Sequence, residues 1–524
     1  MCSLNKVRWW RIAVVLLVAA GNADAGPADT DSLFEVVDPE MLPQVWQQQA
    51  NERMMFPMRM ADIAARIGRE RQLFVDNALI GKAENVTRQI HQPVRSPHNP
   101  MLDDQTVWWL QHVIKFDESP RFRMWYNPAV NFHLWKPNQR IRFVTAYAVS
   151  EDGVNWERPD LGLYKIPKYP YGNVALPYGM MHGLFHEPWE PDPQKRFKAI
   201  VCVEIKEDKN GKLGDLMMPE GYYLHWSPDG IHWQGDLENM VIPSPVGRAF
   251  PMNGIGDTSR FWWDSIRKKY MGDVKLILYN PTQRCRGMME SDDLVHWTRP
   301  HLTFHGTEPN IQIYGHSAMV YEGMYIGFRW RSPTDYFWQE VHAIELALDC
   351  SRDGSIWTRV GAGQLFMERS DTERKTWAAP HAWDADQMAA RSAFVVDDRI
   401  WLYYNGGGSV GLATLRRDGF ASLNADDAGG TVVTRPLTFK GKRLHVNAEV
   451  AEDGELRVGF RTRDGKRSVQ VFGIEECVPI KGDHTDVKVA WRSGDDVGPL
   501  SDTIPRIEFK LRNAKLYSFW FEGD

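Results

Sequence analysis

The chain has 524 residues, a net charge of −6 and 43% hydrophobic residues. This length and hydrophobic content exclude a wholly disordered protein and favour one large domain accompanied by a smaller one. The acidic balance argues against nucleic acid or an anionic membrane surface as a partner, so a neutral ligand fits better.

The first 25 residues have the order of a cleaved export signal. The basic residues Lys6, Arg8 and Arg11 precede an apolar run over residues 12–20, and small residues follow up to Ala25. This run is too short to span a bilayer, and no later segment approaches the ~18 consecutive apolar residues of a membrane helix. We therefore expect a signal peptide over 1–25 and a periplasmic or secreted protein without a membrane segment.

Residues 26–90 have a mixed pattern. Short helices are predicted within 39–65, and a first strand is predicted over 72–76. We expect this segment to be an N-terminal lead-in that wraps onto the main domain.

A short phrase of the form Ser-x-Asp-Gly-x-x-Trp recurs along the middle of the chain, with Gly in three of its four copies. The copies end at Trp156, Trp233, Trp297 and Trp357, at intervals of 77, 64 and 60 residues, and a degenerate fifth copy lies at 417–420. Such a period is typical of radially repeated sheets, in which each repeat is one four-stranded blade. The sequence therefore predicts an all-β protein with a five-bladed β-propeller over 91–424.

The aspartates of the repeated phrase are interpreted as structural. An Asp side chain can accept hydrogen bonds from nearby backbone amides, and Gly supplies a positive φ for the turn. Because these aspartates recur at equivalent positions, catalytic groups must be sought where the repeats differ.

Beyond residue 419 the pattern changes to short alternating strands separated by polar turns. This favours a C-terminal antiparallel β-sandwich over 431–524, with the boundary between 424 and 430.

The first strand of each repeat is expected to face the propeller axis, where side chains from several blades can hold one polar ligand. Asp257 and Asp384 stand where their repeats begin, outside the turns. Two carboxyl groups facing one cleft are the minimum for glycoside hydrolysis. We therefore predict Asp257 and Asp384 as catalytic residues, with Glu340 preferred over Glu345 as the acid.

Other polar and aromatic residues near these strands are predicted to bind substrate hydroxyl groups or sugar rings. They are His91, Arg95, Asn99, His182, Arg260, Trp263, His316 and Asp386. The lone histidines also have a structural interpretation.

No metal site is indicated by the cysteines or histidines, because no CxxC pair or Cys/His cluster occurs. No cofactor is expected; an axial calcium ion would suit clustered aspartates, although no calcium-loop motif is present. The four cysteines that follow the signal are interpreted as isolated buried thiols rather than disulfides.

The five copies, the export signal and the expected sandwich together resemble the five-bladed glycosidases of the invertase, levanase and arabinanase kind. Residues 73–76, 296–300 and 411–420 resemble exported bacterial proteins described as family 32 N-terminal-domain-like. The resemblance covers nearly the whole mature chain and implies a glycoside hydrolase acting on a poly- or oligosaccharide. The Asn-Asp-Pro-Asn, Arg-Asp-Pro and Glu-Cys motifs of the better-known families are missing in their usual form, since Glu476-Cys477 lies in the expected sandwich.

Three alternatives remain open at this point. The propeller could bind carbohydrate without catalysis, as the missing motifs suggest. The repeated phrase also resembles the Asp box of sialidases, although those have six blades. A polysaccharide lyase would need a Tyr or His base beside a charge-neutralising group. The sugar, the linkage, the stereochemistry and the oligomeric state are not given by the sequence.

Overall fold

The computed structural model describes residues 62–102, 107–128, 133–136, 139–141, 143–167, 169–203, 205–207, 221–243, 258–278, 283–304, 311–333, 344–361, 364–370, 383–385 and 389–523. The chain divides into two compact units, residues 1–57 and 58–524, and the described residues all belong to the second. The expected signal peptide therefore lies outside the described residues. Among those residues, no helix has the length and apolar character needed to cross a membrane.

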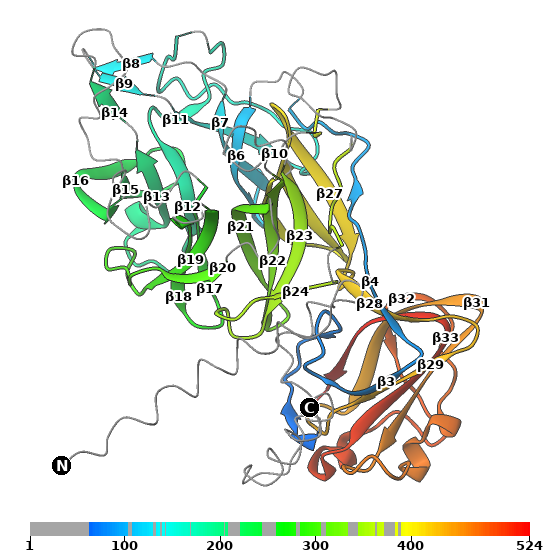
Figure 1. The fold of residues 1–524 in the computed structure, drawn as a ribbon. Coiled ribbons are helices and arrows are strands. Elements are labelled where there is room, and N and C mark those ends of the chain that lie inside the picture. The colour runs from blue at the N-terminus through cyan, green and yellow to red at the C-terminus, as the bar shows by residue number, and fades with distance from the viewer. Residues whose placement is uncertain are drawn as a thin grey trace, which may run out of the picture. The chain divides into compact units, whose positions relative to one another are not determined.

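The second unit consists almost entirely of β-strands, which confirms the all-β class (Figure 1). One four-stranded sheet has the order β11-β10-β7-β6. Its strands are β6 (Val107–Lys115), β7 (Phe122–Pro128), β10 (Thr145–Ser150) and β11 (Val174–Leu176). Strand β6, the first of these four strands in chain order, forms one edge of the sheet.

Eight of the strands from β12 to β20, all except β14, form one sheet in which two four-stranded groups meet. The first group is β12 (Met180–His186), β13 (Phe197–Val203), β15 (Gly221–Ser227) and β16 (Gln234–Pro243). The second group is β17 (Arg260–Asp264), β18 (Lys269–Leu278), β19 (Gln283–Ser291) and β20 (His301–Phe304). The groups join through a parallel pairing of Gly183 with Phe261. A Cβ atom at Gly183 would lie 2.7 Å from Cβ of Phe261, so this junction requires glycine.

Two further four-stranded sheets follow, with the orders β21-β22-β23-β24 and β25-β26-β27-β5. The first contains β21 (Ile311–Tyr321), β22 (Met324–Pro333), β23 (Glu345–Ser351) and β24 (Thr358–Arg359). The second contains β25 (Ala389–Val396), β26 (Arg399–Asn405), β27 (Val410–Arg416) and β5 (Val94–Arg95). The outer strand of this last group therefore comes from the N-terminal side of all the other groups.

Five strands, one from each four-stranded group, contact one another in a cycle. They are β6, β12, β17, β21 and β25, and they are called the first strands below. The links join β6 to β12, β12 to β17, β17 to β21, β21 to β25, and β25 back to β6. They consist of His112 Nε2 with Met181 O (3.0 Å), the Gly183–Phe261 pairing, Thr258 Oγ with Tyr314 O (2.7 Å), Ser317 Oγ with Ala390 O (2.7 Å), and the Val113 amide with Ser392 Oγ (2.9 Å). These first strands thus surround a common axis.

The turns of the repeated phrase have the predicted structural role. The Asp152 carboxylate accepts hydrogen bonds from the amides of Val154 and Asn155, both at 2.8 Å, and Gly153 has a φ of 74°. The equivalent aspartates Asp229, Asp293 and Asp353 accept the same pair of amide hydrogen bonds. In the third copy Leu294 takes the glycine position at a φ of 68° and its side chain is buried.

The C-terminal strands form a large sheet with β3-β29-β33-β28-β4 as its main path, and β2, β31 and β32 pair off this path. Its C-terminal members are β28 (Ala421–Ala425), β29 (Gly430–Thr434), β31 (Arg443–Arg461), β32 (Gly482–Lys488) and β33 (Arg506–Glu522). Strands β2 (Gln72–Leu73), β3 (Ile80–Glu84) and β4 (Thr87–Ile90) of the expected lead-in pair with them. The segment 72–90 is therefore built into this sheet.

Short elements complete the described structure. A two-stranded sheet pairs β1 (Ala65–Arg66) with β30 (Leu437–Thr438), and a three-stranded sheet joins β8 (His133–Lys136), β9 (Gln139–Ile141) and β14 (Ile205–Glu207). The 3-10 helices are η5 (Pro193–Lys195), η6 (Gln470–Phe472), η7 (Ile474–Glu476) and η8 (Gly498–Thr503).

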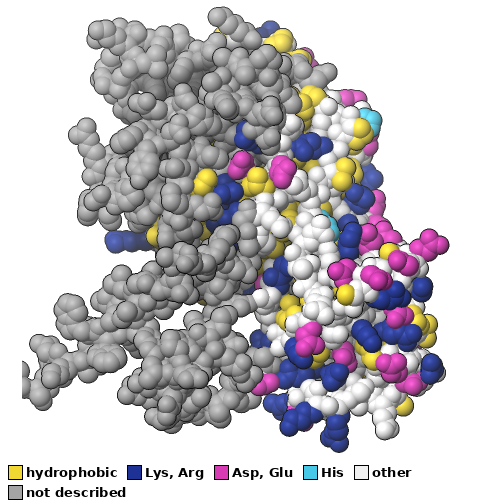
Figure 2. All heavy atoms as spheres, turned by 45° about the vertical axis from the view of Figure 1, so that its right-hand side comes forward, with side chains coloured by type: hydrophobic (Ala, Val, Ile, Leu, Met, Phe, Trp, Pro, Cys, Tyr) yellow, Lys and Arg dark blue, Asp and Glu magenta, His cyan; other side chains and the backbone are white. Residues whose placement is uncertain are grey.

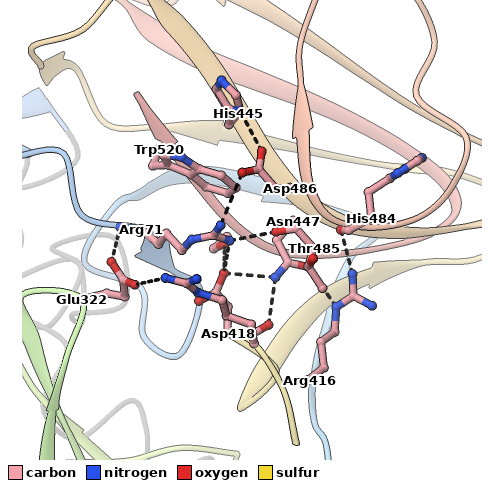
Figure 3. A network of polar contacts seen from close by, with 12 residues as sticks. Arg71, Glu322, Arg416, Asp418, His445, Asn447, His484, Thr485, Asp486 and Trp520 are labelled. Carbon is pink, nitrogen blue, oxygen red and sulfur yellow. Dashed lines mark hydrogen bonds and ion pairs between the residues drawn. The ribbon is translucent and has the colours of Figure 1, made fainter. Parts of the chain in front are cut away.

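The degenerate fifth copy of the phrase has a different role from the other four. The fully buried Asp418 carboxylate accepts hydrogen bonds from Arg71 Nη1 (2.9 Å), Tyr321 Oη (2.6 Å), Asn447 Nδ2 (3.0 Å) and Ser518 Oγ (2.6 Å). Figure 3 shows Arg71 reaching Asp418 beside the ring of Trp520. The Arg71 guanidinium lies 3.6 Å from the centre of that ring. Asp418 thus ties the last repeat to the C-terminal sheet.

The four cysteines that follow the expected signal are buried and free, as predicted. They are Cys202, Cys285, Cys350 and Cys477. On the described surface drawn in Figure 2, acidic and basic side chains are interspersed.

Candidate functional site

Four of the five first strands carry a β-bulge, a place where one strand has an extra residue without a partner opposite. The extra residues are Gln111 in β6, His182 in β12, Tyr314 in β21 and Arg391 in β25. Bulges redirect side chains and interrupt the hydrogen bonding of the ladder, and they are frequent beside active sites. The common axis is therefore surrounded by irregular backbone from four sheets.

Arg260, at the start of β17, connects two of these bulges. Its Nη1 donates to the carbonyl of Gln111 at 2.8 Å and its Nη2 donates to the carbonyl of Arg391 at 2.7 Å. Burial lowers the pKa of Arg260 to about 9. Because its two partners belong to different sheets, this side chain crosses the axis.

A cavity of about 260 Å³ lies beside Arg260 and is lined by residues of all five first strands. The lining comes mainly from the second half of each strand, and it includes His112, Arg391, Trp262, Trp263 and Phe394. Trp189 also lines it and is 64% exposed. The ring centres of Trp189 and Trp263 are 6.4 Å apart. The cavity thus combines arginines with aromatic walls.

Asp384 lies five residues before the start of β25, and its side chain is buried. Its carboxylate accepts hydrogen bonds from Arg95 Nε (2.9 Å), Tyr404 Oη (2.9 Å) and Ser370 Oγ. Burial and the nearby Asp384 charge raise the pKa of Tyr404. The structure therefore brings together the predicted residues Asp384 and Arg95 as an ion pair.

Asn99 lies near this pair. Its Nδ2 donates to the Leu412 carbonyl at 2.9 Å and to Tyr404 Oη at 3.4 Å, and its Oδ1 accepts from the Leu412 amide at 2.8 Å. Both hydrogen bonds to Leu412 hold the chain before β6 against β27. Asn99 thus supports the same corner of the last sheet as Arg95.

His182 and His316 are both fully buried, in different sheets. His182 Nδ1 lies 3.3 Å from Tyr222 Oη. His316 Nδ1 lies 3.0 Å from the Asp273 carboxylate, and the ring is packed against Phe304 and Trp357. In this arrangement His316 joins two neighbouring groups, β17–β20 and β21–β24.

The remaining described residues of the predicted set lie in separate places. His91 Nε2 is 2.7 Å from Ser422 Oγ, beside the C-terminal sheet, and burial lowers the pKa of His91. Trp263 lines the axial cavity together with Arg260. Asp257, Glu340 and Asp386 lie outside the described residues. Asp257 directly precedes Thr258, whose hydroxyl links β17 to β21.

Sequence reasoning missed several residues of this region. Gln111, Tyr314 and Arg391 occupy bulges, and bulges leave no residue pattern in the sequence. Trp108, near the start of β6, is 54% exposed because a second bulge shifts it out of the ladder. The adjacent tryptophans Trp108 and Trp109 are the only signal of this feature in the sequence of β6.

No protein-family model and no curated protein matches the sequence. Solved structures do match at low identity. A family 32 β-fructofuranosidase from Bombyx mori is 10% identical with a TM-score of 0.37, and the match covers 83% of this chain and 94% of that one. A thermostable family-43 glycoside hydrolase is 12% identical with a TM-score of 0.36, over 61% of this chain and 93% of that one.

A third match is an N-acetylgalactosamine deacetylase from F. plautii, solved in complex with blood group B trisaccharide. It is 14% identical with a TM-score of 0.40, over 64% of this chain and 96% of that one. Glycoside hydrolases, the class named by the sequence resemblance, thus recur among the matches. The proposals below rest on the residues and contacts of this chain.

Proposed function

We propose that residues 91–420 form a five-bladed propeller and that the C-terminal sheet, which already includes β28 from Ala421 onward, folds on itself as a sandwich. The five four-stranded groups and the cycle of their first strands support this proposal. Strand β5 completes the last group from the N-terminal side, as expected when a ring of blades closes.

We further propose that the protein is a glycoside hydrolase acting on an oligo- or polysaccharide. The observation that carries this proposal is the buried Asp384, which lies five residues before β25 and pairs with Arg95. Asp257 lies three positions before β17 in the sequence. Its location at the same end of the axis as Asp384 is part of the proposal.

In this proposal the three predicted acids have different roles. Asp384, held by its ion pair with Arg95, serves as a carboxylate beside the sugar. Asp257 attacks the sugar or activates water, and Glu340 donates a proton to the leaving oxygen. The exposed Trp108 at the start of β6 offers a flat surface for a sugar ring.

The test is hydrolysis of a glycan panel by the mature protein and by three single variants, Asp257→Asn, Asp384→Asn and Glu340→Gln. Loss of a positioned acid or base costs about 10²- to 10⁴-fold, so each variant should lose at least a hundredfold in kcat/KM. Asp353→Asn, in a turn of the repeated phrase, is the matched control and should retain activity. Full activity in both aspartate variants contradicts the proposed site.

A carbohydrate-binding propeller without catalysis is the second candidate. The observation that favours it is the saturation of Asp384, which already accepts hydrogen bonds from Arg95, Tyr404 and Ser370. Calorimetric binding of glycans without any product release by the wild-type protein would support this candidate over hydrolysis.

Export is proposed on the basis of the first 25 residues. Mass spectrometry of the protein from the periplasm or medium tests it. A mature chain beginning at Gly26 supports export, whereas an intact Met1 in the cytoplasm contradicts it.

A further inference from the structure

The axial cavity contains a buried cation that no carboxylate of the described residues neutralises. This cation is Arg260, which is 5% exposed and lines the cavity. Its guanidinium donates to the carbonyls of Gln111 and Arg391, and its Nη1 lies 3.5 Å from His112 Nε2. A buried charge without a counter-charge is costly. A ligand that brings a negative charge would therefore relieve this cost.

A second cation lies in the same cavity lining. The Arg391 guanidinium is 4.4 Å from the ring centres of both Trp109 and Trp330. The faces of these rings attract the positive charge through cation–π interactions. The lining contains one carboxylate among the described residues, Glu187. Glu187 already accepts hydrogen bonds from Lys198 Nζ at 2.8 Å and from Tyr270 Oη. Among the described lining residues, arginines therefore outnumber carboxylates, which suits an anion better than a calcium ion.

The lining of the cavity also offers a hydrogen-bond acceptor, the side chain of His112. His112 is 7% exposed and lines the cavity, and burial together with the charges of Arg260 and Arg391 lowers its pKa well below the ordinary value. Its Nε2 lies 3.0 Å from the Met181 carbonyl, which can only accept, and 3.5 Å from Arg260 Nη1, which can only donate. We assign the proton to Nε2 because the contact with the carbonyl is the shorter one. The neutral ring therefore keeps an acceptor at Nδ1, to which a ligand hydroxyl can donate.

The walls and the size of the cavity limit the ligand to one ring. Trp262, Trp263 and Phe394 provide flat apolar surfaces, and the exposed Trp189 lies at the outer side. Such surfaces stack on the C–H faces of sugar rings. A volume of about 260 Å³ is slightly below the ~300–1,000 Å³ of sites for larger ligands.

We propose that this axial cavity is a binding site for a sugar acid, a single sugar ring that carries a carboxylate. The carboxylate pairs with Arg260, a hydroxyl donates to His112, and the ring lies against Trp262 and Trp263. The cavity is formed by the second halves of the first strands, whereas Asp384 precedes the start of its strand. The sugar-acid site is therefore separate from the proposed catalytic end and stands independently of hydrolysis.

Isothermal titration calorimetry of the mature protein tests the proposal with glucuronate, glucose and acetate as probes. Glucuronate should bind at least tenfold more tightly than either glucose or acetate, and its affinity should fall as salt is raised. An affinity for glucose equal to that for glucuronate would show that Arg260 does not bind a carboxylate. An affinity for acetate equal to that for glucuronate would show that the sugar ring does not contribute to binding. No binding of glucuronate would overturn the proposed site.

Variants then locate the bound ligand. Arg260→Gln should weaken glucuronate binding at least tenfold, and Trp189→Ala, a change at an exposed side chain, should weaken it several-fold without loss of folding. Tyr164→Ala, at an aromatic side chain that is 36% exposed and outside the cavity lining, is the matched control and should leave the affinity unchanged. Loss of binding in Tyr164→Ala but not in Trp189→Ala would overturn the proposed location.

Two further binding measurements distinguish a glycan end from a free sugar acid as the ligand, and the sugar-acid site from the proposed catalytic site. A disaccharide with a terminal glucuronate that binds as well as glucuronate indicates a glycan end, and a much weaker disaccharide indicates the free sugar acid; either result supports the site. Asp257→Asn should retain the wild-type affinity for glucuronate, so failure of the hydrolase proposal would leave this one standing. A loss of glucuronate binding in Asp257→Asn would contradict the separation of the two sites.

Discussion

Replacement of Asp418 by Asn should destabilise the protein far more than the same change in another copy of the repeated phrase. Asp418 is fully buried and accepts hydrogen bonds from four side chains, of which Arg71 is charged (Figure 3). Removal of one partner of a buried ion pair costs about 3–5 kcal/mol. Without the Asp418 charge, Arg71 keeps only a longer ion pair, 3.7 Å from its Nη2 to Oδ2 of the exposed Asp486. We expect a loss of this size in the free energy of unfolding.

Asp353→Asn is the matched control. Asp353 caps its own turn through the amides of Ser355 and Ile356, both at 2.8 Å. Asn caps such turns about as well as Asp, so this change should cost about 0.5 kcal/mol or less. The two substitutions have the same chemistry and differ only in the environment of the carboxylate.

Urea unfolding measures both variants through the midpoint and slope of the transition. A double variant, Arg71→Met with Asp418→Asn, should cost clearly less than the sum of its single changes, because the two side chains interact directly. A cost for Asp418→Asn within 1 kcal/mol of the control, or strict additivity in the double variant, would refute the role of Asp418 in joining the last repeat to the C-terminal sheet.

Three other predictions follow from single features of the fold. Gly183→Ala should lower the free energy of unfolding by about 1–3 kcal/mol, because its Cβ would lie 2.7 Å from Cβ of Phe261; an unchanged urea midpoint would contradict this. The four cysteines should react with a thiol reagent only after unfolding, since all are buried and free; rapid labelling of the native protein would contradict it. Burial tends to raise the pKa of Asp152, but the hydrogen bonds from the amides of Asn155 and Val154 lower it from 3.8 to about 2. The stability that this turn contributes is therefore present above pH 3.8 and is lost as the pH falls towards 2. Thermal unfolding at these pH values should show a smaller loss of stability in Asp152→Asn than in the wild type.

The repeated phrase was a strong guide to local structure. Its Asp and Gly residues determine the turn by their own chemistry, so the bonds of Asp152 to Val154 and Asn155 were predictable from neighbouring residues alone. The same reasoning could not separate Asp418 from the other copies, because its partners come from residues 71, 321, 447 and 518. Long-range contacts of this kind are not encoded in a local pattern.

The candidate site was less predictable than the turns. The sequence placed functional residues on the first strands. His182 lies in β12, Asp384 precedes β25, and Arg95 lies in β5 and pairs with Asp384. The bulges were not predictable, because a bulge depends on the register between two strands and not on either sequence alone. The role of Arg260 follows from the bulges, since its partners are carbonyls.

The segment before the first repeat was also beyond local reasoning. A strand over 72–76 was predicted, but neither its partner β33 nor the contribution of β5 to the last four-stranded group could be read from residue patterns. Both pairings join residues more than 300 positions apart in the chain.

The most direct test of the account is the distance between the carboxyl groups of Asp257 and Asp384 in a crystal structure of the mature protein. Glycoside hydrolysis requires a separation of ~5 to 9.5 Å between two working carboxyl groups. Our account predicts a separation in this interval, at the end of the axis where the first strands begin. Carboxyl groups farther apart than this, or located on opposite ends of the ring, would contradict it.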